Sequence, residues 1–220
     1  MKFFLDTANF QEIHDAAALG VLDGVTTNPT LVAKEKGDYH DLLIRICEAV
    51  KGPVSAEVTA TAHDEIVAQG RELARLHPHI VVKVPMIPEG VKAIRTLSRE
   101  GIKINCTLIF SAIQGLIAAK AGASYLSPFV GRIDDTGHEG MVLVRDMVHI
   151  TENYGLEAEV LAASLRHPVH VLEAALAGAH IGTMPKSVFD ACFKHPLTDI
   201  GLARFLEDYR KSQSAVPAGR

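Results

Sequence analysis

Eight short apolar runs, each followed by a longer amphipathic stretch, constrain the fold of this chain more than any other feature. The runs cover residues 2–6, 22–26, 54–58, 80–84, 103–109, 125–130, 159–163 and 179–183. Apolar strands that alternate with helices predict a parallel sheet that is covered by those helices. Eight such units in about 210 residues match one closed (β/α)8 barrel.

We therefore predict an α/β protein, a single (β/α)8 TIM barrel with an additional C-terminal helix over residues 199–210. The barrel domain is expected to span residues 1–211, and the small polar segment 212–220, SQSAVPAGR, is expected to be a disordered tail. The alternative architecture is an open doubly wound sheet. That fold usually has a glycine-rich first turn, whereas the first turn here reads DTANF.

Charge, cysteine content and motif content exclude several classes of function. The net charge of −4 argues against a duplex-DNA binder, and no apolar stretch has the length of a transmembrane helix. The 3 cysteines form no CxxC pair, which indicates reduced thiols and a cytoplasmic protein. No histidine cluster has zinc-ligand spacing, and neither a Walker A motif nor GxGxxG occurs. We expect no metal, no nucleotide cofactor and no membrane partner.

Polar residues collect where the predicted strands end, which is where a barrel of this type forms its active site. Seven of the eight strands carry them: Asp6, then Thr26, Thr27 and Asn28, then Glu57, Lys83, Asn105 with Thr107, Ser127 leading to Arg132, and Ser164 with Arg166. Each would be costly as a purely structural core residue. Their convergence on one pocket is the strongest functional signal that the fold prediction provides.

Lys83 is the sharpest single feature, because it interrupts the apolar strand IVVKV. Burial disfavours the ammonium form of a lysine, and a free amine is the form that attacks a carbonyl carbon. The alternative is a lysine that only forms an ion pair with Glu57 or Asp6 inside the barrel. Those two carboxylates are themselves candidates for general acid and base, or alternatively serve only to neutralise Lys83 and Arg132.

Arg132 and Arg166 follow the sixth and seventh strands, near the position where many barrels bind a phosphate group. An arginine fork binds phosphate oxygens in a bidentate manner. The alternative is a pair of surface ion pairs with Asp134, Asp135 or Glu157. Asn28 precedes a proline and is either a ligand-binding residue or simply the cap of the next helix.

Six segments of the chain resemble the motifs of the transaldolase family, and they occur in the same order. They are FLDTAN, GVTTNPTL, VVKVPM, NCTLIFS, SPFVGRIDD and LAASLRH. The most similar group is the short form, which also contains the fructose-6-phosphate aldolases. The resemblance covers about residues 1–210. It implies a metal-free and cofactor-free Schiff-base mechanism on a (β/α)8 barrel, acting on sugar phosphates of the pentose phosphate pathway.

The resemblance also implies a role for each matched residue. Lys83 would form the Schiff base, Asp6 would take the proton of the C4 hydroxyl, and Glu57 and Thr107 would hold a catalytic water. Two further groups would bind the substrate: Asn28, Asn105 and Ser127 at its hydroxyls, and Arg132, Ser164 and Arg166 at its phosphate. Family members of this size assemble as rings, so a homo-oligomer, a pentamer or decamer, is implied as well. The stripe Ile200, Leu202, Phe205 and Leu206 would then contact a neighbour or pack on its own barrel.

Two positions distinguish transaldolases from fructose-6-phosphate aldolases within this resemblance. The aldolases typically carry Gln at the position of Glu57 and Tyr at the position of Phe129, so both positions favour a transaldolase. A phenylalanine has no hydroxyl to organise a proton donor beside the enamine, which would then survive until an acceptor aldehyde arrives. A fructose-6-phosphate aldolase and a barrel that binds phosphosugars without turnover are the alternative functions.

Overall fold

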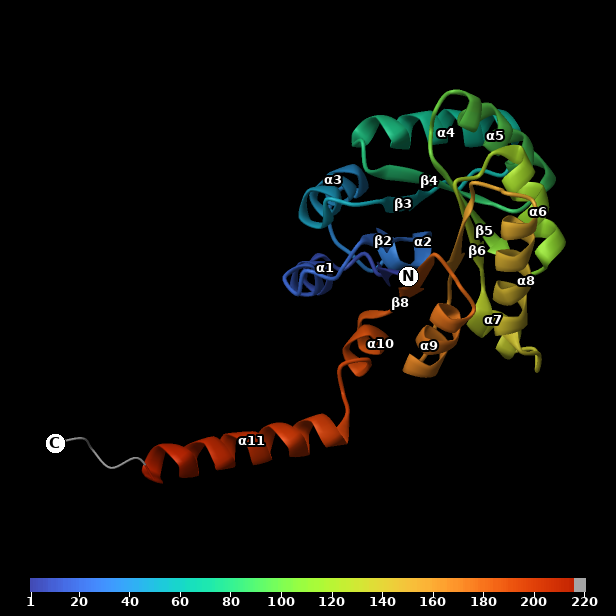
Figure 1. Cartoon of the computed structure of the whole chain (residues 1–220). Coiled ribbons are helices and arrows are strands. Elements are labelled where there is room, and N and C mark those ends of the chain that lie inside the picture. Colours follow the sequence, from blue (N-terminus) through green and yellow to red (C-terminus); the bar gives the residue numbers. More distant parts are fainter. Residues whose placement is uncertain (216–220) are drawn as a thin grey trace.

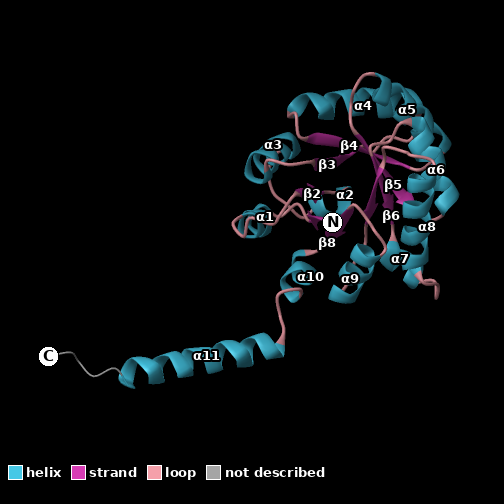
Figure 2. Ribbon diagram, viewed as in Figure 1, coloured by secondary structure: helices cyan, strands magenta, loops and turns pink. Residues whose placement is uncertain are grey.

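The computed structural model describes residues 1–215, and it confirms the predicted single (β/α)8 barrel with an additional C-terminal helix. Eight parallel strands form a closed barrel in sequence order, and β8 pairs with β1 to close it. Helices surround this sheet, and the long C-terminal helix projects away from it (Figures 1 and 2). The open doubly wound alternative is excluded by the closure between the first and last strands.

The strands are short and coincide closely with the predicted apolar runs. They are β1 (Lys2–Asp6), β2 (Gly24–Thr26), β3 (Val54–Glu57), β4 (Ile80–Pro85), β5 (Ile104–Ile109), β6 (Tyr125–Pro128), β7 (Glu159–Ala162) and β8 (Ile181–Met184). The sixth prediction differs, because Val130 begins a helix instead of ending a strand. Its backbone N–H donates a hydrogen bond to the carbonyl oxygen of Ala163, and residues 130–134 form the next helix.

The helices include short ones that the periodicity analysis did not resolve. The described helices are α1 (Phe10–Ala17), α2 (Pro29–Val32), α3 (Tyr39–Val50), α4 (His63–Leu76), α5 (Pro88–Arg99), α6 (Ala112–Ala121), α7 (Val130–Asp134), α8 (Gly140–Asn153), α9 (Pro168–Leu176), α10 (Lys186–Ala191) and α11 (Pro196–Ala215). Asn9 caps α1, and its side chain accepts a hydrogen bond from the backbone N–H of Glu12. The helices α2 and α7 are single turns that immediately follow strands, so their pattern is too short to read as a period.

The helix α11 is longer than the segment 199–210 that the sequence predicts. It continues through residues 212–215, which the sequence analysis assigned to the tail, and residues 216–220 lie outside the described part of the chain. Its apolar side chains remain exposed, including Leu197, Ile200, Leu202, Phe205, Leu206 and Tyr209. No helix within residues 1–215 has the length and hydropathy that crossing a lipid bilayer requires.

Two apolar clusters determine where polar groups can lie. The larger one fills the space between the sheet and the surrounding helices, and the smaller one contains Phe4, Val81, Tyr125, Leu161, Ala163 and Ile181. Successive side chains of a strand alternate between the two faces of a sheet. The members of the small cluster therefore share the barrel interior with the residues two positions later, among them Asp6, Lys83, Ser127 and Thr183. Apolar side chains thus fill the interior below a polar layer at the carboxyl ends of the strands.

Candidate active site

The polar layer surrounds a small cavity at the carboxyl ends of the strands, where the sequence analysis expects the active site. Its volume is about 130 Å³, and its walls are Asp6, Thr26, Asn28, Lys83, Ser127, Phe129, Arg132, Leu161, Ala163, Ser164 and Thr183. Seven of the predicted site residues are therefore brought together. The other four, Glu57, Asn105, Thr107 and Arg166, lie outside this wall, and the first two contact it through hydrogen bonds or an ion pair.

Lys83 lies in the wall of the cavity with only 5% of its surface exposed. Its Nζ is 3.0 Å from Oε2 of Glu57 and donates a hydrogen bond to the backbone carbonyl of Thr27 at 3.2 Å. The register between β3 and β4 places Glu57 directly opposite Lys83, so the ion pair follows from strand pairing. Of the two partners that the sequence allows, Glu57 is the one within ion-pair distance. The pair places a carboxylate beside the amine that would attack a carbonyl.

Asp6 lies at the end of β1 and accepts a hydrogen bond of 2.8 Å from Oγ1 of Thr26. Burial raises the pKa of its carboxyl group above the ordinary value, while the positive charge of Lys83 and the bond from Thr26 oppose that rise. A buried carboxyl group with a raised pKa accepts a proton more readily than an exposed one. Asp6 is therefore suited to exchange protons with a bound ligand.

Asn105 and Ser127 form one buried hydrogen-bond network with Ser55. Ser127 Oγ donates to Oδ1 of Asn105 at 2.6 Å, and Nδ2 of Asn105 donates to Ser55 Oγ at 3.1 Å. Asn105 is fully buried, and its link to the cavity is the hydrogen bond from Ser127. The network fixes the orientation of both side chains.

Thr107 is fully buried on β5, on the same strand face as Asn105 two residues earlier. Its Oγ1 finds no hydrogen-bond partner among the residues that the structure describes. A buried hydroxyl without a protein partner is a favourable position for an ordered water or a ligand oxygen. The side chain is therefore available for the role that the resemblance assigns to it.

Asn28, Phe129 and Ser164 each line the cavity from the start of a loop or short helix. Asn28 caps α2, because its Oδ1 accepts a hydrogen bond of 3.0 Å from the backbone N–H of Leu31. Its amide NH2 is therefore the group that can donate a hydrogen bond to a ligand. Phe129 packs edge-on against Phe110, with ring centroids 5.8 Å apart. Ser164 adopts a left-handed backbone with φ of 58°. Such strained residues occur most often at functional sites.

The two predicted phosphate-binding arginines differ in their surroundings. Arg132, on α7, lines the cavity. Arg166 instead binds both carboxylate oxygens of Asp135 through its two terminal nitrogens, and its side chain is 44% exposed. The Arg166 bonds and the charge of Arg132 hold the pKa of Asp135 below its ordinary value. Arg166 thus forms the surface ion pair that the sequence analysis kept as its alternative, at the rim beside Arg132.

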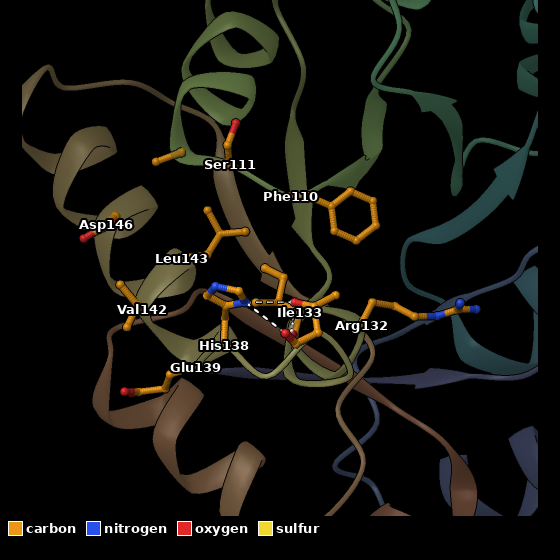
Figure 3. A pocket seen from close by; sticks show the side chains of 11 residues that line it. Phe110, Ser111, Arg132, Ile133, His138, Glu139, Val142, Leu143 and Asp146 are labelled. Carbon is orange, nitrogen blue, oxygen red and sulfur yellow. Dashed lines mark hydrogen bonds between the residues drawn. The ribbon is translucent and has the colours of Figure 1, made fainter.

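A second, larger cavity of about 650 Å³ shares Arg132 with the first, and Phe110, Ile133, His138, Val142 and Leu143 are among its other lining residues. Figure 3 shows the guanidinium of Arg132 extending away from the cluster formed by His138, Val142 and Leu143. That cluster is largely apolar, so the charged group of Arg132 lies apart from it. Arg132, on α7, is thus the residue that lines both cavities.

Three polar residues at this site were not assigned a role by the sequence analysis: Ser55, Thr26 and Thr183. Thr26 was noted only as a residue at a strand end. Ser55 precedes Glu57 by two positions, so strand alternation could have placed both side chains on one face. Thr183 could have been found in the same way, because it follows the interior residue Ile181 by two positions. Among the described residues, no group of three or more His, Cys, Asp and Glu side chains is arranged to hold a metal ion.

Comparison with known proteins identifies the family of this chain. A family model described as Transaldolase/Fructose-6-phosphate aldolase matches residues 3–216. A probable transaldolase of Kosmotoga olearia is 58% identical over 96% of this chain and 98% of its own. Probable transaldolases of Petrotoga mobilis and Herpetosiphon aurantiacus are each 56% identical, covering 97% and 98% of this chain and 96% and 98% of their own. The chain is therefore an enzyme of the transaldolase/fructose-6-phosphate aldolase family.

Proposed function

We propose that this enzyme is a transaldolase that moves a dihydroxyacetone unit from a ketose phosphate to an aldose phosphate through a Schiff base on Lys83. The donor is sedoheptulose 7-phosphate or fructose 6-phosphate, and the acceptor is glyceraldehyde 3-phosphate or erythrose 4-phosphate. The observation that carries the proposal is the buried Lys83 amine, 3.0 Å from the Glu57 carboxylate, in a cavity that Asp6 also lines. The names of the relatives support the same activity.

The first half-reaction begins when the Lys83 amine adds to the C2 ketone of the donor, and water leaves to give an iminium ion. Asp6 takes the proton of the C4 hydroxyl, the C3–C4 bond breaks, and its electron pair moves into the iminium ion. The aldose product departs and a three-carbon enamine remains on Lys83. This enamine attacks the acceptor aldehyde, Asp6 returns the proton to the new hydroxyl, and hydrolysis frees the product and the amine.

Water must leave during imine formation and return during hydrolysis, so both steps require proton transfer. We assign a catalytic water to Glu57 and Thr107. The carboxylate is in contact with the reacting amine, and the Thr107 hydroxyl is buried without a protein partner in the described structure. Asn28 and Ser127 would orient the hydroxyls of the dihydroxyacetone unit, and Asn105 would act with Ser127, to which it is bonded.

The substrate phosphate would bind at the rim of the cavity, at Arg132 and Ser164, with Arg166 as a second cation. Arg132 and Ser164 both line the cavity. Arg166 would have to exchange its carboxylate partner Asp135 for the phosphate. Such an exchange replaces one charge-assisted bidentate interaction with another.

A fructose-6-phosphate aldolase is the second candidate, since the family contains both activities. Phe129 favours the transaldolase, because it presents a ring without a hydroxyl to the cavity. An enamine beside that ring has no phenol to assist its protonation, so it remains available to the acceptor. In an aldolase the enamine would be protonated and released as dihydroxyacetone.

We also propose that residues 1–211 act as one catalytic unit and that the enzyme assembles into a pentamer or decamer. The support is α11, whose exposed apolar side chains extend beyond the barrel (Figure 1). A helix with this much exposed apolar surface is stabilised when it packs against another surface. A place in the pentose phosphate pathway and a cytoplasmic location stay predictions.

The deciding experiment measures glyceraldehyde 3-phosphate release from fructose 6-phosphate, with and without erythrose 4-phosphate. Release that depends on the acceptor supports the transaldolase, and equal release without it identifies an aldolase. In parallel, borohydride reduction with fructose 6-phosphate should leave a three-carbon adduct on the Lys83 peptide, and Lys83→Met should form none. A wild-type protein that binds the sugar but forms no adduct and releases no product would be a binding barrel.

A further inference from the structure

Two hydroxyl groups lead from Asp6 to the last strand of the barrel. Thr26 Oγ1 donates to Asp6 Oδ1 at 2.8 Å, and the same Thr26 oxygen lies 2.7 Å from Oγ1 of Thr183. Both threonines are buried, each with 2% of its surface exposed, and both border the cavity. The three residues come from β1, β2 and β8, which are adjacent where the barrel closes.

The direction of these hydrogen bonds follows from counting hydrogens. A threonine hydroxyl has one hydrogen to donate and two lone pairs with which to accept. Thr26 donates its hydrogen to the Asp6 carboxylate, which can only accept when it is ionised. The short contact between the two threonines must then use the hydrogen of Thr183. Thr183 is thus the donor and Thr26 the acceptor.

We propose that Thr183 is a positioning residue for the acid/base Asp6, which it serves by donating to Thr26 and so aiming the Thr26 hydrogen at the carboxylate. The inference rests on the proposed function, in which Asp6 takes the proton of the C4 hydroxyl. Without the Thr183 hydroxyl, nothing in this chain of bonds holds the Thr26 hydrogen in that direction. Hydrogen bonds in a chain also strengthen one another, so the bond to Asp6 weakens when the outer one is lost.

The effect matters because burial makes the Asp6 carboxylate costly to ionise. The charged groups that face it across the cavity are Lys83 from β4 and Arg132 from α7, and Glu57 from β3 is bonded to Lys83. Lys83 and the bond from Thr26 are what favour the charged form of Asp6. Weakening that bond should therefore raise the pH at which Asp6 becomes ionised and active as a base.

The test compares the pH dependence of kcat for the wild type, Thr183→Val, Thr183→Ser and Thr26→Val. A hydrogen bond to a charged group is worth enough to move a pKa by about 1–2 units, which is the shift expected for Thr26→Val. Cooperativity of roughly 10–30% makes the shift for Thr183→Val about 0.1–0.6 pH unit. In both variants the acid limb moves to higher pH. Thr183→Ser retains the donor and should keep the acid limb at the wild-type pH.

Borohydride trapping of the Lys83 imine provides the control for folding, because imine formation does not use Asp6 in the proposed mechanism. If Thr183→Val fails to trap the imine, Thr183→Ala, which also lacks the hydroxyl, replaces it. If the acid limb of the folded Thr183 variant stays unmoved or shifts to lower pH while that of Thr26→Val shifts to higher pH, only the role of Thr183 is overturned. An unmoved limb in both variants overturns the assignment of Asp6 as well. A wild type without carbon–carbon bond cleavage would refute the proposed function itself.

Discussion

Replacement of Arg132 by alanine tests whether the rim of the cavity binds a phosphate group. A guanidinium that binds phosphate through two charge-assisted hydrogen bonds contributes roughly 1.5–3 kcal/mol for each bond. At the solvent-facing rim we take the lower value, about 3 kcal/mol for both bonds. Since 1.4 kcal/mol corresponds to a factor of ten, kcat/KM for fructose 6-phosphate should fall about 100-fold.

The assay compares fructose 6-phosphate with unphosphorylated fructose as donor, at a fixed erythrose 4-phosphate concentration. Arg132→Ala should affect the phosphorylated donor by about 100-fold and the unphosphorylated one by less than about threefold. Arg166→Ala should cause a smaller selective loss, because phosphate binding there must first displace Asp135. Asp135→Asn removes that competitor and should improve KM for the phosphorylated donor.

Arg145→Ala is the matched control, because Arg145 carries the same charge on α8 and pairs with Glu139 at a distance from the cavity wall. It should leave the ratio of the two donors unchanged. Equal losses on both donors in Arg132→Ala would refute the phosphate role, since a defect in positioning or folding does not depend on the phosphate group. A larger selective loss in Arg166→Ala than in Arg132→Ala would show that Arg166 is the main phosphate ligand, against the expectation drawn from the position of Arg132 in the cavity wall.

Three other predictions follow from the same site and from α11. Phe129→Tyr should raise acceptor-free release of glyceraldehyde 3-phosphate from fructose 6-phosphate by roughly tenfold or more, because a phenol assists proton transfer to the enamine; an unchanged rate in a coupled assay would contradict this account. Asp6→Asn should lower transfer at least about 100-fold. Because burial raises the pKa of Asp6, its stabilising contribution is complete below the unfolded value near 3.8 and is lost as the pH rises through the folded value. Asp6→Asn has no such loss, so the difference between its Tm and that of the wild type should be more positive at pH 7 than at pH 4. A more positive difference at pH 4 would be evidence against a raised pKa of Asp6. Phe205→Glu combined with Ile200→Glu should convert the oligomer to smaller species in light scattering while leaving the imine at Lys83 trappable, since both side chains are exposed on α11; an unchanged mass would exclude this helix from the interface.

The chemistry-bearing strands were predictable because their apolar runs are interrupted by single polar residues. Lys83 within IVVKV and Glu57 at the end of a short run are conspicuous for that reason. The strand alternation then places each polar residue two positions after an apolar one that fills the barrel interior, as with Val81 and Lys83. Both signals are local, so a single sequence contains them.

Other features depend on which strands and loops become neighbours. The ion pair between Arg166 and Asp135 is an example, because these two residues lie 31 positions apart on different loops. The same holds for α7, where five residues form one helical turn that has no readable period. Its first residue, Val130, was predicted as part of the strand because an apolar, buried residue fits a strand and a helix equally well.

The sequence by itself determined the number and order of the strand–helix units, the polar residues at the strand ends and the family to which these motifs are similar. Only the tertiary structure decided which of those polar groups touch. The register between β3 and β4 selected Glu57 as the partner of Lys83. The closure of β8 against β1 brought Thr183 to Thr26 across 157 positions. Hydrogen bonds and ion pairs act over a few ångströms, and a barrel closes that distance only when all eight strands have paired.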